Sequence, residues 1–158
     1  MVHSRSSGKD WLDAQRVDYR VIPTPAKLSS KQIIEMIHCR PEQVLEYEFY
    51  MGPKDPVIVV RSHGKKTNIH ELEKHVGMSP LRVGENNECL AHTGLSLQHL
   101  HPFLENYLWK VIDEQIFDEE KVYLYAGNEH EILEVEANSL KYVIGVINGL
   151  LAEVCERK

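Results

Sequence analysis

The stretch 44-VLEYEFYMGPKDPVIVVRS-62 decides the fold. Two runs rich in β-branched and aromatic residues, 44–51 and 57–62, flank the segment GPKDP. Glycine and proline have permissive or fixed backbone angles and are typical of turns. We therefore predict a β-hairpin, and its second strand is apolar enough to be central in a sheet.

Helical patterns with capping signals lie on both sides of this hairpin. Ser29 and Ser30 precede an amphipathic run at 31–37, and Asn68 precedes another at 69–76 that stops at Gly77. Serine and asparagine favour the first position of a helix, and glycine favours the end. Two further helices are expected, at 9–16 and 85–92.

The remaining strand-like segments are short. They lie at 17–23, 81–83, 108–113, 121–127 and 131–137. After Asn138, apolar residues recur at helical spacing and predict one amphipathic helix over 138–158. The residues of this stripe are Leu140, Val143, Ile144, Ile147, Leu150, Leu151 and Val154.

These elements predict the α+β class, with a mixed, mostly antiparallel sheet of about seven strands and helices packed around it. A chain of 158 residues suits one domain over 1–158, and residues 1–8 are expected to be a flexible N-terminus. No run approaches the roughly 18 apolar residues of a membrane span, so no membrane partner and a cytoplasmic location are expected. The oligomeric state is left open.

The composition restricts the partners. Cys39, Cys89 and Cys155 have no C-x-x-C spacing, so we expect reduced thiols. The net charge of −6, as a global average, argues mildly against a nucleic-acid partner, and no DNA partner is expected. Within 54–82, however, Lys and Arg outnumber Asp and Glu six to three, and this segment is the one suited to a polyanion.

Three histidines lie in 91-AHTGLSLQHLHPFLE-105. An extended 97–101 would place His99 and His101 on the same side, but His92 lies across a turn and no carboxylate or cysteine at ligand spacing completes a set. Histidines that line a surface or a pocket are the simpler interpretation. The sequence also lacks the G-x-S-x-G elbow, the phosphate-binding loop and the dinucleotide fingerprint, so neither a metal nor another cofactor is predicted.

One ordered series of segments resembles a known family. The segments are 17-VDYRVIPTPAKLSSKQI-33, 42-EQVLEYEFYM-51, 57-VIVVRS-62, 67-TNIHELEKHVG-77 and 93-TGLSLQHLHP-102. In this order they resemble the YbaK and prolyl-tRNA-synthetase-associated domain family. Its free-standing members remove wrongly attached amino acids from tRNA. The resemblance implies that fold and a trans-acting aminoacyl-tRNA deacylase that acts without a cofactor.

The resemblance also indicates the site. Thr93, Gly94 and Pro102 fit the family's loop pattern. Glu46 takes the position of the family's pocket lysine, and Gln98 that of the loop's second glycine. A shift of two residues along the strand would place Glu48 there instead.

These positions define two sets of candidate residues. The expected catalytic set is Glu46, Thr93, Gly94, Gln98, His99, His101 and Pro102, and the expected phosphate-binding set is Arg61, Lys65 and Lys66. Glu46 is a candidate for binding the substrate α-amino group or for acting as a general base, and His99 or His101 for supplying a base. The alternative is an inactive module that keeps the fold and binds an amino acid, another small ligand or a protein segment.

Overall fold

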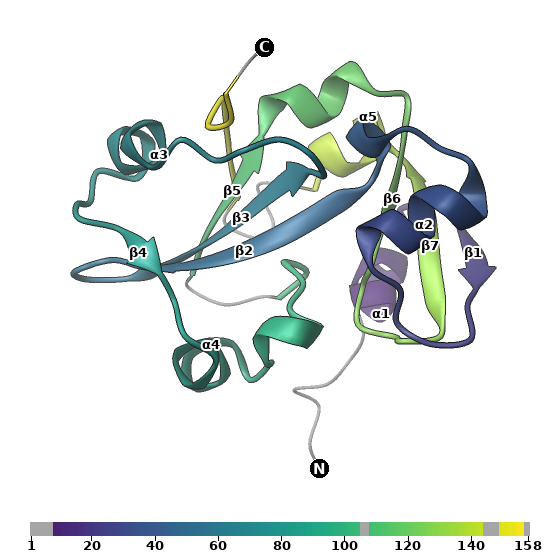
Figure 1. Ribbon diagram of the computed structural model, residues 1–158, viewed down its shortest axis with the longest axis horizontal. Coiled ribbons are helices and arrows are strands. Elements are labelled where there is room, and N and C mark those ends of the chain that lie inside the picture. The colour runs from purple at the N-terminus through teal and green to yellow at the C-terminus, as the bar shows by residue number, and fades with distance from the viewer. Residues whose placement is uncertain (1–7, 105–107, 144–148, 157–158) are drawn as a thin grey trace.

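The computed structural model describes residues 8–104, 108–143 and 149–156, and arranges their strands in two sheets (Figure 1). The three-stranded sheet has the order β1-β7-β6, with β1 at Tyr19–Pro23, β7 at Glu131–Glu136 and β6 at Lys121–Leu124. The five-stranded sheet has the order β4-β2-β3-β5-β8. Its strands are β4 at Arg82–Val83, β2 at Leu45–Met51, β3 at Pro56–Ser62, β5 at Trp109–Asp113 and β8 at Gly149–Ala152.

The α-helices of the described residues are short. They are α1 at Gly8–Ala14, α2 at Ser30–Ile37, α3 at Ile69–Val76, α4 at Asn86–Thr93 and α5 at Ala137–Lys141. The predicted caps are confirmed: the Ser29 and Asn68 side chains accept hydrogen bonds from the first turns of α2 and α3. Gly77 ends α3 with a left-handed backbone, φ 69°.

The α+β class and the hairpin are confirmed. Strands β2 and β3 pair antiparallel, from Leu45 opposite Ser62 to Met51 opposite Pro56. β3 is central, as expected, because β5 pairs parallel with its other edge. The prediction of one sheet of about seven strands is wrong in detail, since the described residues form eight strands in two sheets. An isolated bridge between Val44 and Tyr123 joins the two sheets at their border.

The predicted C-terminal helix is wrong. The helix α5 ends at Lys141, and Gly149–Ala152 forms β8, parallel to β5. Residues 144–148, which the prediction also covered, lie outside the described residues. The apolar stripe fits a buried strand as well as a helix, and the open edge of β5 supplied the hydrogen-bonding partner that favoured the strand.

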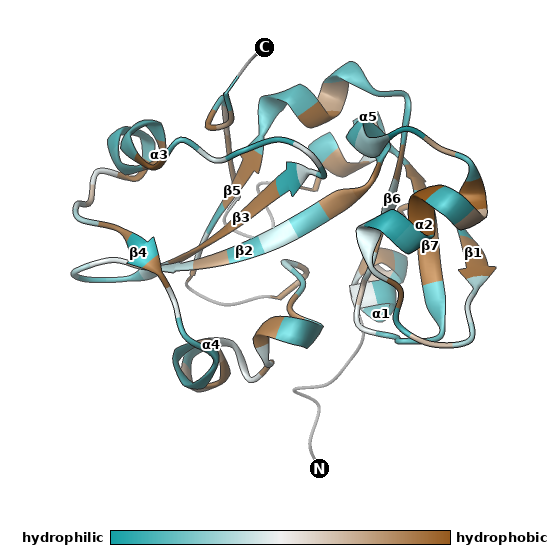
Figure 2. Cartoon of the chain, viewed as in Figure 1, coloured by the Kyte–Doolittle hydropathy of each residue, from teal (hydrophilic) through white to brown (hydrophobic). Residues whose placement is uncertain are grey.

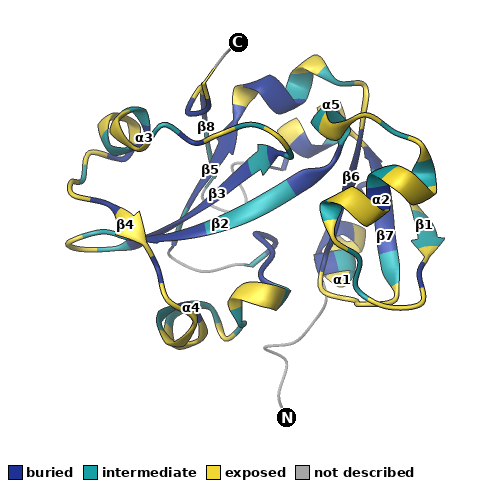
Figure 3. Ribbon diagram, in the orientation of Figure 1, coloured by how far each residue is buried: buried dark blue, intermediate teal, exposed yellow. Residues whose placement is uncertain are grey.

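The two faces of the five-stranded sheet are covered by different helices. Leu72 and Val76 of α3 pack on Tyr50 and Val59, whereas Cys89 of α4 packs with Phe49 and Ile58 on the other face. β3 is apolar along most of its length, but β2 has a hydrophilic stretch in its middle (Figure 2). The same stretch is only half-buried, beside the buried β3 (Figure 3).

The start of the described chain differs from the prediction, whereas the cysteines agree with it. Gly8, assigned to a flexible N-terminus, is buried at the start of α1, and residues 1–7 lie outside the described part. The three cysteines are free thiols. In the part of the chain that the structure describes, no helix has the length and apolar character needed to cross a bilayer.

Candidate active site

Glu46 lies in the hydrophilic stretch of β2 and is held by three donors. The Arg61 Nη1 atom is 2.8 Å from one carboxylate oxygen, Oε1. The other oxygen, Oε2, lies 2.5 Å from the hydroxyl of Ser30, at the start of α2, and 2.6 Å from Nδ1 of His63. These contacts connect the first half of β2 to the helix α2 and to the turn after β3.

The environment keeps Glu46 ionised. Burial by itself raises the pKa of a carboxyl group, but the hydrogen bonds from Ser30 and His63 and the charge of Arg61 outweigh it and lower the pKa of Glu46. A carboxylate has about four acceptor positions, and three of those on Glu46 are used within the protein. Glu46 is therefore a poor general base, but it retains room for about one further donor.

Glu46 also lines a cavity of about 350 Å³, here called the Glu46 cavity. Its walls come from β2, from the segment before α2, and from the turn after α4. The lining residues are Lys27, Leu28, Ser29, Ser30, Ile33, Leu45, Glu46, Tyr47, Arg61, Leu97, Gln98, Leu100 and Tyr125. The structure thus brings Glu46 and Gln98 to one cavity, whereas Glu48 binds Arg61 and Thr67.

Lys27 supplies a cation to the Glu46 cavity. Its Nζ atom lies 4.6 Å from the ring centroid of Tyr125. Burial lowers the pKa of Lys27, which the charge of Glu129 partly opposes. A half-buried ammonium over an aromatic face is held in place and is a stronger donor than a solvated one.

A second cavity of about 420 Å³, here called the His99 cavity, adjoins the first at Tyr125. It is lined by Leu90, Gly94, Leu95, Ser96, His99, His101, Tyr125, Gly127 and Glu129. His99 lies 2.8 Å from Ser96 Oγ through Nδ1 and 2.7 Å from a carboxylate oxygen of Glu129 through Nε2. The two histidines of the loop are therefore in a different cavity from Glu46.

His101 is almost completely buried, with 1% of its surface exposed. Its Nδ1 atom accepts a hydrogen bond from the backbone N–H of Phe103 at 3.2 Å. Burial lowers the pKa of His101 to about 4, so the ring is neutral at pH 7 and carries its proton on Nε2. Residues 97–99 form a 3₁₀ turn, and the extended segment considered for a metal site is absent. Within the described residues, no group of three or more His, Cys, Asp or Glu side chains is placed to hold a metal ion.

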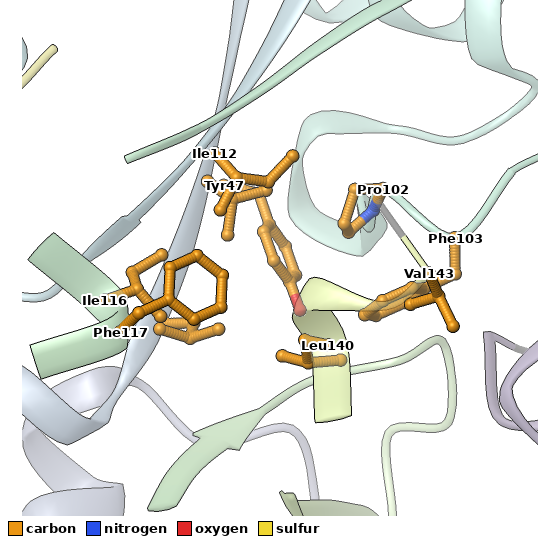
Figure 4. Close-up of a pocket in the computed structure, with 10 residues that line it drawn as sticks. Tyr47, Pro102, Phe103, Ile112, Ile116, Phe117, Leu140 and Val143 are labelled. Carbon is orange, nitrogen blue, oxygen red and sulfur yellow. The ribbon is translucent and has the colours of Figure 1, made fainter. Parts of the chain in front are cut away.

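The remaining predicted residues of the loop, Thr93, Gly94 and Pro102, have structural roles. The Thr93 hydroxyl binds the carbonyls of Cys89 and Leu95 and the N–H of Leu95. Gly94 ends α4 in a left-handed conformation, φ 79°. Pro102 is buried beside Tyr47 in an apolar cavity of only about 30 Å³ (Figure 4). The small volume and the apolar lining indicate a packing gap rather than a ligand site.

The chain belongs to a known family, because a family model described as the aminoacyl-tRNA editing domain matches residues 24–142. It is an editing-domain protein. The matched range includes β2 with Glu46, the loop 93–102 and Glu129, and it confirms the resemblance. No curated protein matches the chain.

Solved structures support the same fold. One is a hypothetical protein with a TM-score of 0.83 and 20% identity, covering 94% of this chain and 98% of that one. Another, described as a proposed trans-editing enzyme for prolyl tRNA synthetase, has a TM-score of 0.78 and 17% identity, covering 99% of both chains. A scaffold protein used to graft an epitope backbone has a TM-score of 0.80 and 16% identity, covering all of both chains.

The phosphate-binding candidates of this editing domain are divided between two roles. Arg61 has only 15% of its side chain exposed and binds both Glu46 and Glu48. Lys65 and Lys66 lie in the turn that follows β3, next to His63. Arg61 is therefore engaged by two carboxylates, whereas Lys65 is half-buried and Lys66 is exposed.

Several lining residues of the two cavities were not identified from the sequence, among them Lys27, Ser96, Tyr125 and Glu129. The three-residue spacing of Ser96 and His99 was a usable signal, since one tight turn brings such a pair together. Glu129 carried no signal, because it is 30 positions from its partner His99.

Proposed function

We propose that the protein is a trans-acting aminoacyl-tRNA deacylase that hydrolyses the ester of a mischarged tRNA. The observation that carries this proposal is the Glu46 cavity. It joins Glu46 and Gln98, the two positions where the resemblance places the pocket, within the part of the chain matched by the editing-domain family. A cavity of about 350 Å³ has the size of a small-ligand site.

The charges in the Glu46 cavity indicate which group of the substrate each side chain would bind. Glu46 is ionised and has room for one more donor, which suits the α-ammonium group of an aminoacyl ester. Lys27 lines the same cavity as the opposite charge and suits an electron-rich oxygen of the substrate other than the ester carbonyl. The side-chain amide of Gln98 adds donors at the rim.

The tRNA contact is assigned to Lys65 and Lys66. They follow His63, which binds Glu46, so the turn lies beside the cavity. Phosphate contacts by lysine release counterions, and the affinity that they provide decreases as salt increases. In this proposal Arg61 holds Glu46 in place and makes no phosphate contact.

The alternative is a binding module without catalysis. It is favoured by one observation: the position given to the family's lysine holds a carboxylate that is tied to Ser30, Arg61 and His63. Such a network stabilises the pocket without providing a reactive group. In that case the cavity binds a free amino acid or another small cation-bearing ligand.

The deciding experiment is a deacylation assay against a full panel of misacylated tRNAs, with a known deacylase as the positive control. We expect release of the amino acid from at least one tRNA. If the control is active and no tRNA is deacylated, the enzyme proposal is wrong. Stabilisation by a free amino acid without tRNA retention at low salt then supports the binding module.

A matched pair of variants tests the tRNA surface. Lys65→Glu with Lys66→Glu reverses the charge beside the cavity, and we expect tRNA affinity to fall about 10-fold or more at low salt. Lys54→Glu with Lys141→Glu reverses two exposed lysines that line neither cavity and serves as the control. Equal losses in the two double variants would contradict the assignment.

A further inference from the structure

The His99 cavity contains a hydrogen-bonded series of three side chains that the proposed Glu46 site does not use. Ser96 Oγ is 2.8 Å from His99 Nδ1, and His99 Nε2 is 2.7 Å from Glu129 Oε2. All three residues line the same cavity of about 420 Å³. Ser96 and His99 come from the turn after α4, whereas Glu129 comes from the segment between β6 and β7.

The Glu129 contact determines the tautomer of His99. A carboxylate only accepts hydrogen bonds, so the neutral ring must carry its proton on Nε2. Nδ1 then has a lone pair and accepts a hydrogen bond from the Ser96 hydroxyl. A base whose lone pair points at a hydroxyl, and whose other nitrogen is fixed by a carboxylate, is the arrangement that activates a serine.

Two further polar groups in this cavity are suited to bind an oxygen anion. Tyr125 is 8% exposed, lines the cavity, and its hydroxyl has no hydrogen-bond partner among the described residues. His101 lines the cavity as a neutral ring that keeps its proton on Nε2. A buried hydroxyl without a partner is costly, and a ligand oxygen would satisfy it.

The loop that carries Ser96 is held by its own contacts. Ser96 has an ordinary extended backbone, φ −74° and ψ 163°, and precedes the 3₁₀ turn Leu97–His99. The N–H of Leu97 binds the Asn86 side chain at 2.8 Å, and the N–H of Leu95 binds Thr93 at 3.0 Å. The pair Ser96 and His99 is therefore positioned without the strained elbow that the sequence lacks.

We propose that the His99 cavity is a nucleophilic serine site for acyl esters, with Ser96 as nucleophile, His99 as general base and acid, and Glu129 as positioning residue. His101 and Tyr125 donate hydrogen bonds to the oxyanion. This inference rests on the proposed function only for the identity of the acyl donor, an aminoacyl ester. It assigns the chemical step to the His99 cavity and the binding of the amino acid to the Glu46 cavity.

The reaction has two balanced steps. Ser96 Oγ attacks the carbonyl carbon, its proton passes to His99 Nδ1, and the C–O bond to the leaving alcohol breaks as that oxygen receives the proton from His99. Water then attacks the acyl group on Ser96, gives a proton to His99, and the C–Oγ bond breaks as Ser96 regains that proton. The products are the acid and the alcohol, and no other reactant is needed.

The first test uses the full chain and a fluorophosphonate, which phosphonylates an activated serine as the P–F bond breaks and fluoride leaves. Peptide mass spectrometry of the wild-type protein should locate the adduct on Ser96. Ser96→Ala should abolish labelling, and His99→Gln should slow it about 100-fold. Ser139→Ala and His75→Gln, outside both cavities, should be labelled at the wild-type rate.

The second test separates positioning by Glu129 from simple structural support. Glu129→Gln should slow labelling about 30-fold, because an amide N–H facing Nε2 favours the tautomer with a proton on Nδ1. Glu129→Asp keeps the carboxylate and should recover most of the rate. The melting temperatures of both variants should match that of the wild type, since Glu129 is exposed.

The outcomes distinguish this inference from the proposed function. An adduct on Tyr125 or on another residue overturns the inference, as does a folded protein that takes no label. Full turnover of an amino acid para-nitrophenyl ester by Ser96→Ala also overturns it. Labelling of Ser96 in a protein that deacylates no tRNA supports the serine site and contradicts the proposed function.

Discussion

The two cavities share Tyr125 but hold their carboxylates in opposite ways. Glu46 accepts from Ser30, Arg61 and His63 and is largely saturated within the protein. Glu129 is exposed and, through one histidine, is connected to a serine hydroxyl. A saturated carboxylate stabilises the fold and leaves little capacity for proton transfer, whereas a carboxylate at the end of such a series orients a base.

The largest expected effect is that a variant of the His99 cavity changes kcat, whereas a variant of the Glu46 cavity changes KM. With a misacylated tRNA, Ser96→Ala should lower kcat about 1,000-fold with little change in KM, because it removes the nucleophile. Glu46→Gln should instead raise KM about 10-fold with kcat nearly unchanged, because it weakens binding of the ammonium group. Single-turnover measurements check this, and a similar loss of kcat in both variants would remove the distinction.

His101 should make the protein sensitive to acid. Its folded-state pKa, about 4, is below the ordinary value of 6.5, so the unfolded chain binds the proton first. The stability that it contributes is complete above pH 6.5 and is lost as the pH falls toward 4, by about 3 kcal/mol at most.

The matched variant for this prediction is His101→Asn, which can still accept the N–H of Phe103 but does not titrate. Urea unfolding of both proteins at several pH values measures the difference. The unfolding free energy of the wild type should decrease more steeply between pH 6.5 and 4. If the unfolding free energies of the two proteins change in parallel with pH, burial does not lower the pKa of His101.

Arg61 tests the network of the Glu46 cavity. Arg61→Met leaves Glu46 and Glu48 half-buried without their guanidinium partner and should lower the unfolding free energy by about 2 kcal/mol, less than for a fully buried pair. Arg82→Met removes an exposed ion pair with Glu88 and should have a much smaller effect. Equal losses in denaturant unfolding would mean that the Glu46 network contributes no more than a surface pair.

The smallest expected effect on stability comes from the hydrogen bond between Tyr47 of β2 and the segment after β6. The Tyr47 hydroxyl donates to the backbone carbonyl of Tyr125 at 2.7 Å. Tyr47→Phe should cost about 1 kcal/mol of unfolding free energy. Tyr142→Phe, at a residue that is 87% exposed, is the control and should change nothing measurable. If Tyr47→Phe leaves the unfolding free energy unchanged, this hydrogen bond does not stabilise the protein.

Local sequence signals were sufficient for many elements. The turn GPKDP between two runs of β-branched and aromatic residues predicted the hairpin, and Ser29, Asn68 and Gly77 predicted helix boundaries. These signals succeed because capping and turn formation involve residues a few positions apart. The C-terminal helix failed because Leu150 and Leu151 lie in β8, whose partner β5 is about 40 residues earlier.

The candidate site was partly predictable. The resemblance identified Glu46 and the loop 93–102, and the structure brings Glu46 and Gln98 to one cavity. Lys27 was missed because a lysine before a capped helix carries no pattern that distinguishes it from a surface lysine. His99 was named as a candidate base, but its contact with Glu129 was missed because Glu129 is on another segment.

The sequence by itself determined the elements near the hairpin, the α+β class and the family, because these depend on local propensities and on an ordered series of motifs. Only the tertiary structure decided that the loop residues divide between two cavities, that Glu46 is saturated, and that Ser96, His99 and Glu129 meet. Hydrogen bonds and burial act between atoms that are close in space, and the order of residues along the chain does not specify which distant side chains come within about 3 Å of one another.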